Sequence, residues 1–397
     1  MLINKYGEQR KDKERKGKII KTVEKPVETK LISCAILDFL KFIKIKYVIH
    51  TGEGLDFGRY HLAQWVPYFL KKSINVLVLV RNQDLYKFVR KQWPFVICVY
   101  AKTVIEVDKV LDRLPYGKTI FYLSNTGNLI HSLRRNDFNH VFLGHGDSNK
   151  FASAHKFFRV YDEIWVSGDA HIDRFKNAGF DVKHITFKKI GRPNLEELIK
   201  INQKTKWQNR SPKIAIIAPT WEGVLEENNG SSVEKLHDII SVLIQNNFIV
   251  KIKFHPATGK RRKDYIDIEK EIIRSSKEMP EKINVLPKEK SLENLLINPC
   301  LCIGDTSGAI TEFLSCYCPI VIYKPEKELI ESNSNMNYDQ FCYSWRTREE
   351  FEAIVLKLAS HEDPLSDNRA KAQNYYLGIS NTLNESFFNL LIESPKQ

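Results

Sequence analysis

The chain has 397 residues, of which 43% are hydrophobic and 11% aromatic, so it is long enough for two domains and its composition excludes a disordered protein. Lysine and arginine outnumber aspartate and glutamate by 61 to 48, and this surplus of 13 positive charges favours phosphorylated substrates, an acidic membrane surface or nucleic acid as partners. The seven cysteines lack zinc-site spacing. The C-x-C pairs Cys300/Cys302 and Cys316/Cys318 have apolar neighbours in the sequence, which indicates buried thiols in a reducing compartment.

The start of the chain is polar. Residues 1–30 form a lysine-rich lead-in without the apolar segment of a signal peptide, and no window reaches 18 uncharged apolar residues. Residues 32–49 predict an amphipathic helix that runs into a strand, because charged residues are interspersed among the apolar residues of this segment. These features predict a cytoplasmic protein. They leave open a peripheral position on an anionic membrane surface.

Residues 31–195 alternate short apolar runs with helical patterns. Such alternation predicts parallel strands joined by crossover helices, with both faces of the sheet covered. Between the runs lie helical patterns such as those at 59–72, 103–114 and 128–135. The runs that predict strands are 46–51, 75–80, 95–100, 118–124, 140–145, 163–168 and 184–191.

A polar connector at 196–212 leads into a second alternating series in residues 213–397, whose last part, after residue 347, is helical. The sequence therefore predicts an α/β protein of two doubly wound, Rossmann-like domains with a cleft between the carboxyl ends of their sheets, where ligands bind. The predicted strands of this second half are 213–220, 248–256, 283–287, 301–305 and 319–325.

A histidine between two glycines ends the run at 140–145: Gly144, His145 and Gly146, with Lys150 four residues further on. Glycines permit close approach of the backbone to a ligand, and an imidazole can take a hydroxyl proton near neutral pH. His145 is therefore a candidate general base. The alternative is a surface histidine in a glycine turn.

Two further candidates stand at strand ends in the second half. His255 is followed by the cations Lys260 and Arg261, a combination that suits a pyrophosphate; a solvated basic loop is the alternative. Thr220 ends the run at 213–220 and Trp221 follows it; the tryptophan either stacks on a base or packs in the core.

The third candidate in this half follows the strand at 301–305. Asp305, Thr306 and Ser307 predict a capped helix start that binds an anion, and Glu312 lies two turns along on a similar face, within reach of a ribose diol. The alternative is an ordinary capped helix. The sequence has no P-loop, and its early glycines match G-x-G-x-x-G only loosely.

Six elements between residues 140 and 325 resemble, in the same order, the motifs of the CDP-glycerol glycerophosphotransferase family, the teichoic-acid and capsule polymerases. GHGDSNK is similar to W-H-G-T-P-x-K, KFHP to R-x-H-P, and GDTSGAITEF to S-D-Y-S-S-x-x-x-D, with Glu312 where the family has Asp. The other three elements are YDEIWVSGDAHIDRFKNAGF, KKIGRPNLEEL and IAPTWEG.

The resemblance implies a GT-B fold, with an acceptor domain at 31–195 and a CDP-donor domain at 213–397. It implies transfer of glycerol phosphate or ribitol phosphate from a CDP-polyol to a hydroxyl of a polymer or lipid-linked acceptor at the inner face of a bacterial membrane, with release of CMP. His145 matches the proposed base, His255 a histidine that contacts the pyrophosphate, Thr306 and Ser307 the phosphate-binding helix start, and Glu312 the acid that binds the cytidine ribose.

Two departures leave the polyol open: Asp147 replaces the family's Thr, and residues 194–196 replace its R-N-D. A GT-B glycosyltransferase that uses a nucleotide sugar for cell-surface polysaccharide synthesis is the alternative. Nucleic acid is not expected as a partner, because the aromatic residues lie mainly in periodic apolar segments. No cofactor or metal ligand is predicted, and a divalent cation bound with the diphosphate stays open.

Overall fold

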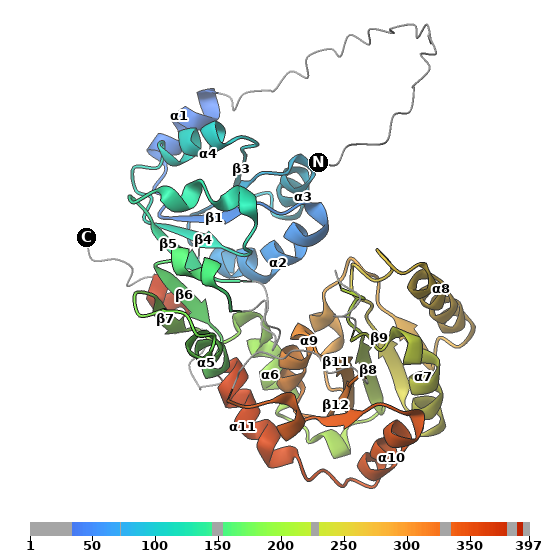
Figure 1. The fold of residues 1–397 in the computed structure, drawn as a ribbon. Helices are drawn as coiled ribbons and strands as arrows, with labels where there is room; N and C mark the ends of the chain where they lie inside the picture. Colours follow the sequence, from blue (N-terminus) through green and yellow to red (C-terminus); the bar gives the residue numbers. More distant parts are fainter. Residues whose placement is uncertain are drawn as a thin grey trace, which may run out of the picture.

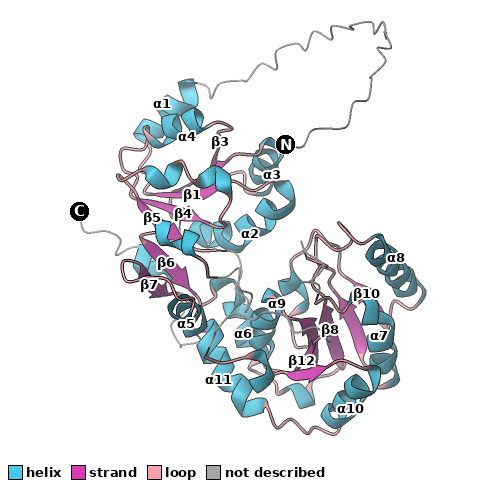
Figure 2. Ribbon diagram, in the orientation of Figure 1, coloured by secondary structure: helices cyan, strands magenta, loops and turns pink. Residues whose placement is uncertain are grey.

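The computed structural model describes residues 34–71, 73–144, 154–223, 230–325, 335–378 and 387–391. Within these ranges the chain forms two separate β-sheets flanked by helices (Figures 1 and 2). Every strand pairing described in either sheet is parallel. The prediction of an α/β protein with two doubly wound halves is therefore confirmed.

The first sheet has the strand order β3-β2-β1-β4-β5-β6-β7. The chain runs outward from β1 to one edge and then from β4 to the other, so the strand order reverses in the middle of the sheet, as in doubly wound folds. Its strands are β1 (Tyr47–Thr51), β2 (Val76–Val80), β3 (Ile97–Tyr100), β4 (Thr119–Tyr122), β5 (Asn139–Phe142), β6 (Glu163–Val166) and β7 (Thr186–Lys189). Most of their residues are buried, except in the edge strand β7, whose four residues are exposed or half-buried.

Two helices of the first half begin where the sequence supplies a side-chain cap. Thr103 and Glu106 form a reciprocal capping box at one helix, and Asn82 caps another. The predicted helix at 59–72 begins earlier than expected, at Leu55, and the predicted helix at 128–135 forms two short 3₁₀ turns instead. The helices are α1 (Cys34–Phe42), α2 (Leu55–Lys71), α3 (Gln83–Gln92), α4 (Val104–Leu111) and α5 (Asp169–Asn177).

The second sheet has the order β10-β9-β8-β11-β12-β13. Strand β13 was not predicted, because it is only three residues long. The strands are β8 (Ile214–Ala218), β9 (Ile249–Ile252), β10 (Ile283–Val285), β11 (Leu301–Asp305), β12 (Ile320–Tyr323) and β13 (Tyr343–Trp345). The helices are α6 (Glu196–Asn202), α7 (Leu236–Gln245), α8 (Lys263–Glu278), α9 (Gly308–Phe313), α10 (Arg348–Ala359) and α11 (Ser366–Leu377).

The end of the chain returns to the first half. Helix α11 contacts α5, and the short helical segment at 387–391 lies beside β6 and β7 (red in Figure 1). Phe387 is fully buried there, with its ring 5.5 Å from that of Trp65 and 5.8 Å from that of Phe69. The sequence predicts a single C-terminal domain at 213–397. Within that range, the segment 387–391 packs into the core of the first sheet.

The cysteines whose surroundings are described are buried free thiols, in agreement with the prediction; they are Cys98, Cys300, Cys302, Cys316, Cys318 and Cys342. None of the described helices combines the length and the apolar content that a membrane crossing needs.

Candidate functional site

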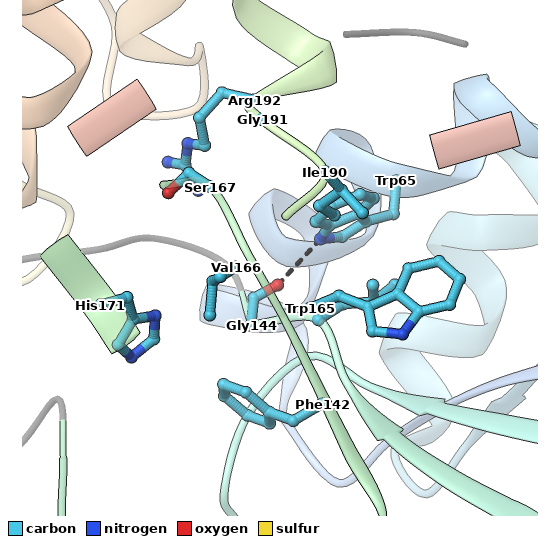
Figure 3. A pocket seen from close by; sticks show the side chains of 11 residues that line it. Trp65, Phe142, Gly144, Trp165, Val166, Ser167, His171, Ile190, Gly191 and Arg192 are labelled. Carbon is cyan, nitrogen blue, oxygen red and sulfur yellow. Dashed lines mark hydrogen bonds between the residues drawn. The ribbon is translucent and has the colours of Figure 1, made fainter. Parts of the chain in front are cut away.

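A pocket lies at the carboxyl edge of the first sheet, where β5, β6 and β7 end (Figure 3). Its lining includes Gly144 and Gly191, which have φ angles of 69° and 66° that favour glycine. Trp65 of α2 closes one side and donates a 2.8 Å hydrogen bond from Nε1 to the carbonyl of Gly144. This is the edge at which doubly wound sheets bind ligands.

The predicted base follows this pocket directly in the chain. His145 is the residue after Gly144, and His145, Gly146 and Lys150 lie outside the described residues. The described part of the motif, Gly144, is buried at the pocket wall. The predictions for the other three residues therefore stay predictions.

Arg192 reaches from the end of this pocket to the second half. It follows β7 and is 6% exposed, and its Nη2 lies 3.8 Å from Oε1 of Glu312 on α9. Tyr68 of α2 donates a 2.7 Å hydrogen bond to the carbonyl of Pro193 and so holds the segment that carries Arg192. The pocket wall of the first sheet and the acid predicted to bind ribose thus meet at one contact between the two halves.

Burial governs the chemistry of Glu312. Its side chain is 15% exposed, and burial raises its pKa to about 7, with the negative charge of Glu293 acting in the same direction and Arg192 in the opposite one. Burial also raises the pKa of Glu293, which accepts a hydrogen bond from Nδ2 of Asn194. Two carboxyls and one guanidinium therefore share a small, poorly solvated volume between the halves.

Asp305 differs from its predicted role as a helix cap. It is the last residue of β11 and is fully buried, and its Oδ2 accepts a 2.6 Å hydrogen bond from the backbone N–H of Thr220. Because β8 and β11 are neighbours in the sheet, their ends meet and the carboxylate links them. In this structure Asp305 positions the loop after β8.

The helix after β11 begins later than predicted. Ser307, one of the predicted caps, occupies the N-cap position of α9 but makes no side-chain capping bond. The Oγ of Ser307 is buried and has no hydrogen-bond partner within the described residues. Thr306 is also buried. The donor-binding role of these residues stays a prediction.

Trp221 and His255 come together at the ends of β8 and β9. Their rings are nearly parallel, at 13°, with centroids 6.0 Å apart, and both side chains are half-buried. Nδ1 of His255 accepts a 3.1 Å hydrogen bond from the N–H of Ala257, which fixes the ring orientation. The core-packing alternative for Trp221 is not supported, because a core tryptophan would be buried.

Glu222 organises the basic loop that follows β9. The residue is 3% exposed, and its carboxylate accepts hydrogen bonds from the backbone N–H groups of Gly259 (3.1 Å), Arg261 (2.7 Å) and Arg262 (3.1 Å). Although burial opposes ionisation, these hydrogen bonds lower its pKa overall. The loop is therefore held at its backbone rather than freely solvated, while the side chains of Lys260 and Arg261 stay exposed.

This loop also contacts the first half. Nζ of Lys260 lies 3.7 Å from Oδ2 of Asp56 and 4.9 Å from the centre of the Phe57 ring, both on α2. The hydroxyl of Tyr60, one turn along α2, donates to the carbonyl of Lys288. The amino-terminal part of α2 is therefore packed against the predicted diphosphate-binding loop.

Sequence reasoning missed Arg192, Glu222 and Glu293. Arg192 stands inside a recognised motif, but nothing in its spacing shows that it faces α9. Glu222 stands inside the IAPTWEG element, but nothing in its spacing shows that it faces the basic loop after β9. Among the described residues, no group of His, Cys, Asp and Glu has the arrangement of a metal site.

No protein-family model matches the chain, and no curated protein matches it. Solved structures resemble it throughout. The wall teichoic acid polymerase TagF aligns at 12% identity over 89% of this chain and 89% of the TagF chain, with a TM-score of 0.58. Anabaena Alr3699/HepE in complex with UDP and glucose aligns at 13% identity over 88% and 99% of the two chains, with a TM-score of 0.51.

A glycosyltransferase from Rickettsia africae aligns at 14% identity over 87% of this chain and 97% of its own, with a TM-score of 0.50. Identities this low establish the fold alone. The chain has the GT-B fold.

Proposed function

We propose that the protein transfers a polyol phosphate, glycerol phosphate or ribitol phosphate, from a CDP-polyol to a hydroxyl of a capsule or teichoic-acid-like polymer, and that it releases CMP. The contact between Arg192 and Glu312 carries this proposal, since it joins the pocket beside the His145 motif to the helix matched to the family's ribose-binding acid. The fold shared with TagF and the order of the six motifs support it.

In the proposed reaction the acceptor oxygen bonds to the phosphorus that carries the polyol, and the bond from that phosphorus to the bridging oxygen breaks. The acceptor proton passes to His145, and CMP leaves with the electron pair. His255, Lys260 and Arg261 neutralise charge on the diphosphate, and Trp221 stacks beside it. Positioning and charge neutralisation suffice for phosphoryl transfer, so no covalent protein intermediate is needed. A divalent cation that arrives with the diphosphate is compatible with this scheme, and EDTA addition with Mg²⁺ rescue tests for it.

The decisive experiment measures nucleotide release with CDP-glycerol, CDP-ribitol and UDP-glucose as separate donors and teichoic-acid or capsule oligomers as acceptors. We expect CMP from a CDP-polyol. In His145→Ala, turnover should fall by about 10²–10⁴-fold while CDP binding is preserved, because general-base catalysis is worth about that much. His237→Ala, an exposed histidine on α7, should behave as wild type. Near-normal turnover in His145→Ala would remove this residue from the mechanism.

The second candidate is a GT-B glycosyltransferase with a nucleotide-sugar donor. The likeness to HepE, whose structure holds UDP and glucose, favours it. UDP release from UDP-glucose, with no CMP from either CDP-polyol, would establish this alternative.

A lipid-linked acceptor would place the enzyme at the anionic inner face of the membrane. Helix α1 supports this location: Ile36, Phe39 and Phe42 are 41%, 58% and 85% exposed on one face, and Lys41 and Lys44 are exposed beside them. Co-sedimentation with vesicles that contain phosphatidylglycerol should be lost in the double variant Phe39→Ser/Phe42→Ser. Unchanged sedimentation would contradict the membrane role of this helix.

A further inference from the structure

Arg192 and Arg210 are both buried, and their surroundings differ. The guanidinium of Arg210 donates to the carbonyls of Thr205 (3.0 Å), Pro299, Cys316 (2.9 Å) and Asn202 (2.6 Å), so it ties three chain segments together. In Arg192, by contrast, Nε and Nη2 are buried and have no hydrogen-bond partner within the described residues. Arg210 therefore has a structural role, whereas the Nε and Nη2 donors of Arg192 are available to a ligand.

A buried cation without hydrogen bonds is costly. Moving a charge out of water is offset only by close ionic partners and hydrogen bonds. The Glu312 carboxyl is 3.8 Å away, beyond hydrogen-bonding distance, and its pKa is raised to about 7, so it compensates Arg192 only in part. The arginine therefore retains unused capacity for an anion.

The other residues around Arg192 also suit a bound anion. Figure 3 shows its guanidinium turned toward the pocket, near Ser167, with His171 further along the wall. Both residues are more than nine-tenths buried. They flank the start of α5, whose N-cap Gly168 supplies no side-chain bond to the first-turn N–H groups. The lining also includes the apolar side chains of Trp65 and Val166, which partly exclude water and so strengthen an electrostatic contact.

We propose that this pocket binds a phosphate ester and that Arg192 holds it through the paired N–H groups of its guanidinium. Arginine suits this ligand because its planar fork matches two phosphate oxygens. The inference rests on the proposed function for the origin of the ester, which belongs either to the terminal unit of the acceptor or to the donor diphosphate. Arg192 then acts between the two substrates, with Glu312 behind it.

The test uses isothermal titration calorimetry of the full chain with inorganic phosphate, glycerol 3-phosphate and CDP, each added separately. We expect at least one probe to bind wild type and Arg192→Gln to weaken that binding at least tenfold. The matched control is Lys189→Gln, which removes one positive charge three residues earlier from an exposed side chain and should change affinity less than twofold. If binding of glycerol 3-phosphate depends on Arg192, the site belongs to the acceptor. If binding of CDP depends on Arg192, the site belongs to the donor.

Stability separates a ligand-binding role from a structural one. Arg192→Gln should leave the urea midpoint unchanged or raise it, because it removes an incompletely paired charge, whereas Arg210→Gln should lower it. Should Arg192→Gln fail to fold, Arg192→Lys carries the test: it keeps the charge, loses the fork, and should bind several-fold more weakly.

The proposal is overturned if no probe binds wild type at millimolar concentration, or if all probes bind the Arg192 variants as they bind wild type. Failure of the proposed function is a different result. In that case the calorimetry still shows Arg192-dependent phosphate binding, but wild type releases no CMP from any CDP-polyol.

Discussion

The carboxyl of Glu312 holds its proton more tightly in the folded chain than an exposed glutamate does. Burial raises its pKa from the usual 4.5 to about 7, and the nearby Glu293 adds to this effect. The folded state therefore binds a proton that the unfolded state has released between these two pH values. The unfolding free energy must then fall as pH rises through this window, and the contribution is complete only below pH 4.5.

This dependence predicts the behaviour of Glu312→Gln. Its unfolding free energy should lack the decline, so wild type should lose at most about 3 kcal/mol relative to the variant between pH 4.5 and pH 7.5. Urea unfolding at a series of pH values measures the difference. Glu281→Gln, an exposed position, serves as the control and should run parallel to wild type. A Glu312→Gln curve parallel to wild type would show that this carboxyl does not titrate in the window.

Candidate residues at strand ends were predictable where the sequence itself places them together. Trp221 and His255 follow β8 and β9, which are adjacent in a parallel sheet, so their proximity follows from the strand pattern. Arg192 and Glu222 were not predictable, because their partners depend on the packing of the two halves and on the path of a loop. A buried ion's role is set by the groups it faces, and those are distant in sequence.

At the scale of elements, the turn at Gly259 within the basic loop is tightly constrained. Gly259 has a φ of 82°, and a Cβ there would lie 2.3 Å from Cγ1 of Ile266 in α8. The loop needs this backbone because the N–H of Gly259 must reach Glu222. Lys260, the next residue, contacts α2 of the first half, so the turn also controls how the diphosphate loop meets that helix.

Gly259→Ala should therefore lower the unfolding free energy by about 1–3 kcal/mol and also weaken CDP binding, because strain is relieved only by moving the loop. Gly179→Ala is the matched control: its φ is 74°, but nothing lies within 4 Å of the added Cβ, so it should show the backbone penalty alone and bind CDP normally. Chemical denaturation and calorimetry measure the two effects. Equal losses in both variants would refute a role for Ile266 packing.

The arrangement of the elements was largely predictable from the sequence, since apolar runs bounded by helical patterns indicate buried parallel strands. The exceptions were short or local. Strand β13 has three residues, and the helix after β11 begins at Gly308 because Asp305 is taken up by the backbone of Thr220 and stays in the strand. Local propensity favoured a cap at Asp305, and the contact between neighbouring strand ends prevailed.

At the scale of the whole molecule, three of the described links between the halves bear on the substrate sites or on the first core. Lys260 meets α2, Arg192 meets Glu312, and the chain after α11 returns to the first core. The first two lie at the predicted substrate sites, so ligands there would bear directly on the contact between halves. The third is an apolar anchor and is the link that sequence order could not show, because 387–391 follows every element of the second sheet.

This anchor makes the first half depend on residues 387–391. Phe387 is fully buried against Trp65, Phe69 and Trp165, with ring centroids 5.5, 5.8 and 5.9 Å away. Phe387→Ala would leave a cavity among these rings, and such truncations cost about 3–5 kcal/mol. We therefore expect a clear loss of stability, whereas Phe95→Ala, at a side chain that is 93% exposed, should leave it unchanged.

Hydrogen exchange locates the loss. In Phe387→Ala, amides of β1 and β4 in the first sheet should exchange faster while those of β8 and β11 stay protected, because the cavity opens only in the first core. Trp65 also holds the carbonyl of Gly144, so the damage should extend to the pocket wall and weaken phosphate binding there. Faster exchange confined to β8 and β11 would mean that residues 387–391 stabilise the second half instead, contrary to their observed packing.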